Sequence, residues 1–389
     1  MNHLLDYHAA NKEQKNPRGV WYRLIDLLYA YTAIFQYDGV SVFNSEPQVY
    51  FFVPTDRFSD DNEIDALIRE PDPAAAWRLR YTPAGTHMGG HYAWTIQTYL
   101  NLRTRGVPCC LSRRLPQEGI VLSHERFLRQ VGKPSSRLLL VCLRADQGRI
   151  RYAQLHVVQN PAQVRLPSWY QLWESHFIPY WPQPGLVPRN PSRGNRFEVA
   201  AYLGAEKNLA PALHDAHWAA DLQKRGIEWR PAFTDNAWSD YSNIDAVVAV
   251  RRFQSLHIYD SKPATKLFNA WRAGVPAILG PESGYRAERK TSLDYIEVTS
   301  YQDLIAAIDR LRADSGLRKA MVENGFRRST EVSTDAITER WRQFLTAVAI
   351  PAYVVWQRQS SIRREALFLA RTVHEKAQQL FLGKGGRPP

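Results

Sequence analysis

The segment that decides the fold runs from Lys262 to Gly280 and reads KPATKLFNAWRAGVPAILG. It predicts a helix over 264–273, which Gly274-Val275-Pro276 ends, and then a strand over 275–279. Lysines, a hydroxyl and free backbone amides stand together where this helix begins. Unpaired N–H groups and the helix dipole both favour negative charge at that end. The start of the helix is therefore predicted to bind an anion such as a diphosphate.

Short apolar runs alternate with helical patterns on both sides of this segment. In the second half, strands are predicted over 197–203, 227–231, 245–250, 275–279 and 296–298, with helices over 207–225, 264–273, 301–313 and 316–324. In the first half, strands are predicted over 49–53, 107–111, 119–123, 138–143 and 155–158, with a helix over 92–105. Such alternation is typical of a parallel, doubly wound sheet. Two α/β domains are therefore expected.

A proline-rich segment separates the two series. Residues 178–195 read IPYWPQPGLVPRNPSRGN, whose five prolines neither continue a helix nor serve in a central strand. The predicted division is a helical N-terminal extension over 1–46, a Rossmann-like domain over 47–177, a linker over 178–195, a second Rossmann-like domain over 196–340 and basic C-terminal helices over 341–389.

Both terminal parts are predicted to be helical, and each leaves two interpretations open. The first helix begins at Asn16-Pro17 and ends at Asp38-Gly39, and it either packs on the neighbouring domain or lies on a membrane surface. From Gln357 onward, seven Lys or Arg residues accompany two acidic residues and several apolar ones. A basic amphipathic tail of this kind can lie on an anionic membrane or pack back on the N-terminal domain.

Composition is typical of a soluble globular protein. A chain of 389 residues suits two domains, and its 44% hydrophobic and 23% charged residues exclude a disordered chain. No stretch approaches the roughly 20 apolar residues that a membrane-spanning helix requires, and no signal peptide is recognisable. Three cysteines without CxxC spacing predict neither a disulfide framework nor a zinc site, which favours the cytoplasm. The net charge of +12 favours polyanionic partners.

The order of these elements resembles that of a known family, the nucleotide-sugar glycosyltransferases of the group-1 type with GT-B architecture. The resemblance covers about 177–344 and includes the strand that ends at Gly204, the strand over 245–252, the helix-Gly-Val-Pro-strand unit and the SYQDLIAAIDRL helix. The first half resembles the family in its general plan. The resemblance implies two Rossmann-like domains that face each other across a cleft, with the acceptor on the N-terminal side and the sugar donor on the C-terminal side.

In that family the C-terminal domain binds the diphosphate and ribose of the donor, and basic residues neutralise the charge that builds on the leaving nucleotide. The basic residues at matching places are Lys266, Lys262, Arg251, Arg252 and Lys207, assisted by Thr265 and the backbone at Gly204. Glu282 and Tyr285, in the GPESGY loop, are expected to meet the sugar or the base.

The sequence departs from the family at two positions. The family commonly carries two glutamates eight positions apart, and Ser261 and Asn269 stand at those places here. Asn269 can still bond to a ribose hydroxyl, but it carries no negative charge. An atypical branch of the family is therefore expected.

The loop GTHMGGH in the first half is the candidate for acid–base chemistry. His87 and His91 flank Met88-Gly89-Gly90; histidine suits general-base work near neutral pH, and the glycines Gly89 and Gly90 allow a ligand to approach the backbone closely. If either histidine is a base for the acceptor, inversion follows; otherwise retention remains open. The absence of any Asp-x-Asp favours stabilisation of the diphosphate by the chain's own cations, with no metal.

The function expected from these residues is transfer of a sugar from a nucleotide-diphosphate sugar, as in glycan biosynthesis, without a metal or bound cofactor. The acceptor is a glycan, a lipid or a small molecule. The expected location is the cytoplasm, including a peripheral position on the inner face of a membrane. The alternative is an inactive GT-B-like module that binds an anionic partner, either membrane or nucleic acid. The twelve tryptophans are spread along the chain, which argues against nucleic acid.

Overall fold

The computed structural model describes residues 47–54, 69, 90–164, 173–234, 237–253 and 259–381, of which 90–93 and 375–381 are described by backbone alone. The predicted N-terminal helix therefore lies outside the described residues. So do His87 and Gly89 of the predicted catalytic loop.

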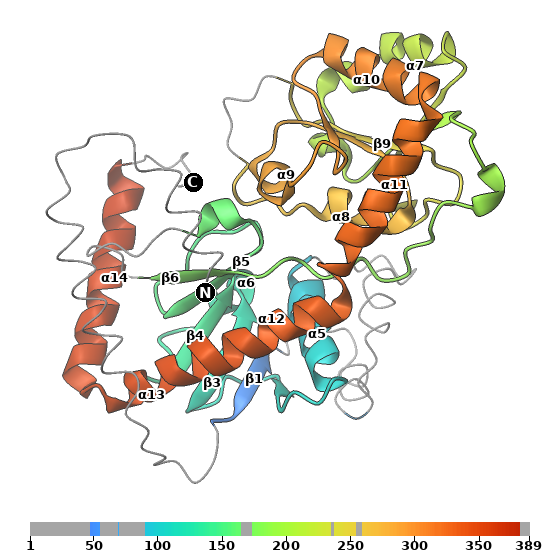
Figure 1. Ribbon diagram of the computed structural model, residues 1–389. Coiled ribbons are helices and arrows are strands. Elements are labelled where there is room, and N and C mark those ends of the chain that lie inside the picture. Colours follow the sequence, from blue (N-terminus) through green and yellow to red (C-terminus); the bar gives the residue numbers. More distant parts are fainter. Residues whose placement is uncertain are drawn as a thin grey trace, which may run out of the picture. The chain divides into compact units, whose positions relative to one another are not determined.

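Six parallel strands among the described residues form the first sheet, in the order β2-β1-β3-β4-β5-β6 (Figure 1). They are β1 (Val49–Phe52), β2 (Cys110–Ser112), β3 (Gly119–His124), β4 (Leu138–Leu143), β5 (Leu155–Val158) and β6 (Glu174–Phe177), with helices α5 (Gly90–Arg103) and α6 (Glu125–Leu128). The strands β3, β4 and β5 are buried along their whole length. β6 was not predicted, because three polar residues out of four conceal its pattern.

The second sheet is also parallel, with five strands among the described residues in the order β11-β10-β9-β7-β8. They are β7 (Val199–Leu203), β8 (Glu228–Ala232), β9 (Ala246–Ala249), β10 (Ala277–Leu279) and β11 (Ile296–Glu297). The accompanying helices are α7 (Ala216–Gln223), α8 (Thr265–Ala273), α9 (Ser283–Glu288), α10 (Tyr301–Ala313) and α11 (Ser315–Thr330). The fold is thus α/β with two parallel, Rossmann-like sheets, which confirms the predicted α/β class.

The prediction of one helix over 207–225 was wrong. The chain instead makes two short 3₁₀ turns, Glu206–Asn208 and Pro211–Leu213, before α7 begins. Pro211 prevents a continuous helix because it lacks a backbone donor. Asp215 then starts α7, since its side chain accepts a hydrogen bond from the amide of His217 at 2.9 Å.

The C-terminal helices pack on the half of the molecule that holds the first sheet. They are α12 (Thr334–Phe344), a π-helical turn (Leu345–Ala349), α13 (Ile350–Arg358) and α14 (Ser361–Phe381). Trp356 donates from Nε1 to the carbonyl oxygen of Ser136 at 2.9 Å, and Phe368 stacks on Tyr152 with ring centroids 4.7 Å apart. None of the helices in the described residues is long and apolar enough to span a bilayer.

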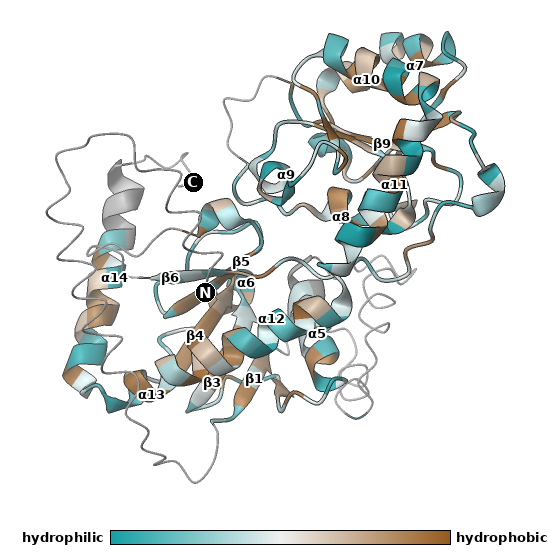
Figure 2. Cartoon of the chain, viewed as in Figure 1, coloured by the Kyte–Doolittle hydropathy of each residue, from teal (hydrophilic) through white to brown (hydrophobic). Residues whose placement is uncertain are grey.

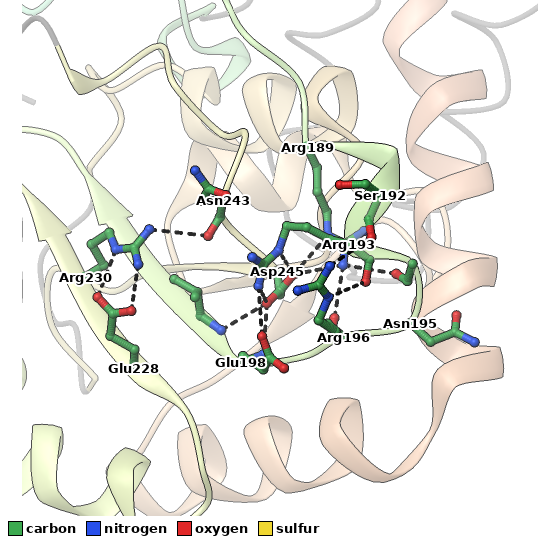
Figure 3. A network of polar contacts seen from close by, with 12 residues as sticks. Arg189, Ser192, Arg193, Asn195, Arg196, Glu198, Glu228, Arg230, Asn243 and Asp245 are labelled. Carbon is green, nitrogen blue, oxygen red and sulfur yellow. Dashed lines mark hydrogen bonds and ion pairs between the residues drawn. The ribbon is translucent and has the colours of Figure 1, made fainter.

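Buried Asp245 fixes the amino ends of the second sheet (Figure 3). Its carboxylate accepts hydrogen bonds from Arg189 at 2.8 and 3.0 Å and from Arg193 at 2.6 and 2.9 Å. It also accepts from the amides of Glu198 at 2.8 Å and Val199 at 3.0 Å. The amino ends of β7 and β9 are thereby held together. The loops that follow the strands lie at the opposite, carboxyl ends.

Side-chain amides connect the first sheet to the loop that precedes α8. Asn160, just after β5, donates to the carbonyl oxygens of Tyr259 at 3.3 Å and Lys262 at 3.0 Å and to the hydroxyl of Ser283 at 3.1 Å. Gln159 donates to the carbonyl oxygen of Ser261 at 3.0 Å. The residues that lead into α8 are therefore held by the other half of the chain.

Candidate anion-binding site

The site is built where strands β7, β9 and β10 end. Gly204 directly follows β7, Arg251 lies two residues after β9, and Glu282 lies three residues after β10. Lys266 is the second residue of α8. Because parallel strands end at the same edge of a sheet, these residues gather at the edge where open α/β sheets bind ligands. The order of elements along the sequence predicts this gathering.

The amino end of α8 presents backbone donors. Its N-cap is Ala264, which makes no side-chain cap. The first intrahelical hydrogen bond runs from the amide of Phe268 to the carbonyl oxygen of Ala264 at 3.0 Å. The amides of Thr265, Lys266 and Leu267 consequently have no intrahelical acceptor. Together with the helix dipole they favour an anion at this place.

Lys266 points its amine toward the end of β7. The Nζ atom lies 5.2 Å from the ring centroid of Tyr202. A Cβ at position 204 would lie 2.8 Å from Nζ, and Gly204 has a φ of +154°, so only glycine fits beside the lysine without strain. Lys266 has no ion-pair partner in the part of the chain that the structure describes.

The environment of Lys266 disfavours its charge. Its pKa is lowered to about 8, first by burial and then by the nearby positive charges of Arg251 and Lys262, although Glu282 partly offsets them. An anion at this place would relieve that cost. The lysine is therefore a half-buried cation that makes no direct ion pair with any of the described residues.

Arg251 and Glu282 form a buried ion pair beside Lys266. The Nε atom of Arg251 donates to the two carboxylate oxygens of Glu282 at 3.0 and 3.1 Å. Their side chains are 13% and 4% exposed. Burial alone would lower the pKa of Arg251, but the facing carboxylate raises it. Burial raises the pKa of Glu282, and the nearby positive charges of Arg251, Lys266 and Lys262 offset this only in part.

Three predicted site residues are placed in or near this pair. Arg251 is a predicted phosphate contact and Glu282 is predicted to meet the sugar or the base; in the structure each forms an ion pair with the other. Tyr285 is buried, with its ring 6.2 Å from that of Tyr295. The charges of Arg251 and Glu282 both act on Lys266, and their long-range pairing has no signal in the sequence.

Lys262 and Asn269 lie in or beside α8 but are engaged elsewhere. Lys262 forms an ion pair with Asp146 of the first half. Asn269 is buried and donates from Nδ2 to Oε1 of Gln183 at 2.5 Å. The side-chain amide of Asn269, predicted to bond to a ribose hydroxyl, thus bonds to the proline-rich segment in this structure.

The remaining predicted residues lie at the surface or outside the group around Lys266. Thr265 is the first residue of α8, partly exposed. Lys207 and Arg252 are exposed, and neither makes a hydrogen bond or ion pair to another site residue within the described ranges. Gly90 is the first residue of α5, so His91 belongs to a helix and not to the expected loop. Its side chain, like His87 and Gly89, lies outside what the structure describes.

Two neighbours of the site were missed in the sequence. Tyr202 supplies the ring beside Lys266. Because alternate residues of a strand share a face, its place two residues before Gly204 could have indicated it. Asp146, which pairs with Lys262, comes from the loop after β4 and has no such local signal.

Comparisons with known proteins bear on the fold. No family model and no curated protein matches the sequence. Solved structures match over most of the chain. In its fold the chain resembles GT-B glycosyltransferases. HepE from Anabaena, in complex with UDP and glucose, is 12% identical over 78% of this chain and 100% of its own, with a TM-score of 0.44.

Two further structures are similar to the same degree. Sucrose-phosphate synthase from Thermosynechococcus elongatus is 13% identical over 59% of this chain and 73% of its own, with a TM-score of 0.42. OtsA is 13% identical over 73% and 85%, with a TM-score of 0.39. At these identities and TM-scores, the likeness concerns the fold alone.

Proposed function

We propose that this protein transfers a sugar from a nucleotide-diphosphate sugar to an acceptor, and that the start of α8 holds the diphosphate. One observation carries the proposal: the Lys266 amine lies beside Gly204, next to the uncapped amides of α8, with no ion-pair partner among the described residues. A diphosphate supplies the two things this place lacks, negative charge and hydrogen-bond acceptors.

The same groups suit the chemistry of the leaving nucleotide. Negative charge develops on the departing diphosphate in the transition state, and fixed donors aimed at it lower the barrier. Lys266 and the amides of α8 would supply that stabilisation. Arg251 is already paired with Glu282. In this proposal the chain's own cation does the work of a metal ion.

The acceptor is assigned to the side of the first sheet. His91, in the first turn of α5, or His87 before it, would take the proton from the attacking hydroxyl. With such a base the anomeric configuration inverts in a single displacement. Without one, retention remains open.

Nucleoside diphosphate binding is expected to weaken as pH rises above about 8. The pKa of Lys266 is lowered to about 8, and a bound diphosphate raises it again, so binding takes up a proton. Above the pKa of the free protein, the Kd should rise by up to about tenfold per pH unit. The free energy of unfolding of the ligand-free protein should increase as pH rises from the lowered pKa to the ordinary value near 10.5. In that range the unfolded chain binds a proton that the folded chain has lost.

Calorimetry with UDP, GDP and ADP in buffers of different ionisation enthalpy measures this proton uptake directly. The Lys266→Arg variant is the control, since arginine stays charged throughout the range. It should bind with a Kd that is almost independent of pH. An unchanged pH dependence in Lys266→Arg would assign the titrating group to another residue.

The function itself is tested by a panel of nucleotide sugars, with thermal shift and release of nucleoside diphosphate as the two readouts. A transferase is stabilised by its donor and slowly releases nucleoside diphosphate, even to water. Absence of both effects for every donor would contradict the proposal.

An inactive binding module is the second candidate. The observation in its favour is that Ser261 and Asn269 occupy the places of the family's two glutamates, and that Asn269 is committed to Gln183. Such a module would be stabilised by a nucleoside diphosphate but would release none from any donor, with or without acceptor.

A further inference from the structure

Helix α14 carries an apolar strip on its outer side. Ile362, Leu369 and Val373 are 80%, 62% and 58% exposed. They are spaced by seven and four residues, and the exposed Ala366 and Ala370 lie between them. Residues at these intervals share one face of an α-helix. The exposed apolar strip, defined by these five residues, runs along about three turns of α14.

The strip is not the face by which α14 packs on the protein. Phe368 stacks on Tyr152, and Arg371 is only 8% exposed. Arg371 lies nine residues after Ile362, which places it on the opposite side of the helix. The helix therefore packs with one side, while the apolar strip on its other side is left at the surface.

Exposed apolar side chains of this size are scattered elsewhere. Outside α14, the large apolar residues that are exposed among the described ones are Val164, Val187, Phe326 and Val355. Val355 belongs to the preceding helix α13, while the other three stand singly, as is normal on protein surfaces. Figure 2 shows hydrophobic residues recurring along α14 between hydrophilic ones. The clustering in α14 is what requires an explanation.

The charge around the strip is positive. Arg363 follows Ile362 directly and Arg358 ends α13; both are exposed, and neither has an ion-pair partner in the described part of the chain. The acidic neighbour Glu365 is neutralised by Lys133 at 2.7 Å. The whole chain carries a net charge of +12. The strip therefore combines apolar side chains with unpaired guanidinium groups.

We propose that the strip docks on the surface of an anionic lipid bilayer, with α14 lying parallel to the membrane. Apolar side chains of an interfacial helix enter the boundary between headgroups and acyl chains, while flanking arginines contact lipid phosphates. A second copy of the chain fits less well. Three large side chains fall short of the roughly 1,200 Å² that a stable interface buries, and a symmetric pair would bring the arginines together. The proposal does not depend on sugar transfer.

The experiment measures binding of the full chain to vesicles by flotation. One set of vesicles contains phosphatidylcholine alone, and the other also contains phosphatidylglycerol. The expected result is binding to the anionic vesicles that weakens as salt is added. No binding to anionic vesicles at low salt would overturn the proposal.

Two variants separate the contributions of the strip and the charges. Ile362→Ser/Leu369→Ser/Val373→Ser should weaken binding by about tenfold or more, with an unchanged Tm because these side chains are exposed. Arg358→Gln/Arg363→Gln should weaken it by roughly fivefold per arginine, for anionic vesicles alone. The control is Val164→Ser/Val187→Ser, which removes exposed apolar side chains elsewhere and should bind like the unmodified chain. Equal binding by the triple variant and the control would refute the role of the strip.

A probe on the strip distinguishes a membrane from two other partners, another segment of the same chain and a second copy of the chain. In a Cys110→Ser background, an environment-sensitive dye on Leu369→Cys should report water in the free protein and an apolar surrounding after vesicles are added. An apolar signal in the free monomer means that the chain itself covers the strip. An apolar signal that grows with protein concentration means a second copy. Either result overturns the proposal.

Discussion

Replacing Lys266 with methionine is expected to abolish most donor turnover while leaving the protein folded. Loss of a charge-assisted contact to the diphosphate should weaken nucleoside diphosphate binding by about tenfold to a hundredfold. The rate constant kcat should fall by about 10²–10³, because the same cation stabilises the leaving group. Stability should not fall, since burial already disfavours the charge and lowers the pKa of the amine. Calorimetry, nucleotide release and Tm measure the three effects.

Lys207 is the matched control for Lys266. Both lysines are predicted from the sequence as phosphate contacts, but Lys207 is exposed on a 3₁₀ turn. Lys207→Met should therefore change diphosphate affinity by less than about threefold, which is the effect of a distant surface charge. Equal losses in Lys207→Met and Lys266→Met would show that the site extends beyond the start of α8. A fully active Lys266→Met would remove that lysine from the site.

The second large effect is expected on stability. Asp245→Ala leaves Arg189 and Arg193 facing each other without their shared carboxylate, in a place where the two side chains are only 16% and 10% exposed. Removal of one partner from a buried ion pair costs about 3–5 kcal/mol of unfolding free energy. Chemical unfolding followed by tryptophan fluorescence measures the loss. Arg230→Ala, which breaks an exposed pair with Glu228, is the control and should cost below about 1 kcal/mol.

The carboxylate of Asp245 also makes the free energy of unfolding depend on pH in the acidic range. Burial by itself raises the pKa of Asp245, but hydrogen bonds from Arg193, the Glu198 amide and Arg189 outweigh it and hold the pKa below its ordinary value. The stabilisation is therefore complete above the ordinary carboxyl pKa near 4 and is lost as pH falls through the lowered value. Asp245→Asn should lose this acid-dependent component, which a titration of unfolding midpoints between about pH 2 and 6 would detect.

Much of the fold could be predicted from local signals. The strands β4 and β5 and the helix α10 have the predicted bounds, because each is a mostly apolar run or a clear helical pattern with a cap. The helix over 264–273 and the strand after it are also found. From the order of these elements, parallel topology alone brings Gly204 and Lys266 together.

The interior of the site could not be predicted, because it depends on which charged groups pair. Nothing near Arg251 in the sequence indicates that Glu282, thirty-one residues later, neutralises it. The pairing of Lys262 with Asp146 joins residues more than a hundred positions apart. Sequence patterns identify candidates by residue type and place, but contacts between loops of different strands decide which cation remains without a partner.

The bonds from Asn160 and Gln159 have a mechanical consequence for the α8 site. They end on Tyr259, Ser261 and Lys262, within seven residues of Lys266. Any separation of the two halves must therefore break contacts in the segment that leads into α8. Under the proposed function, loss of these contacts would be coupled to release of the nucleotide. A substitution at Asn160 is then expected to change nucleotide affinity, although Asn160 belongs to the half of the chain that holds the first sheet.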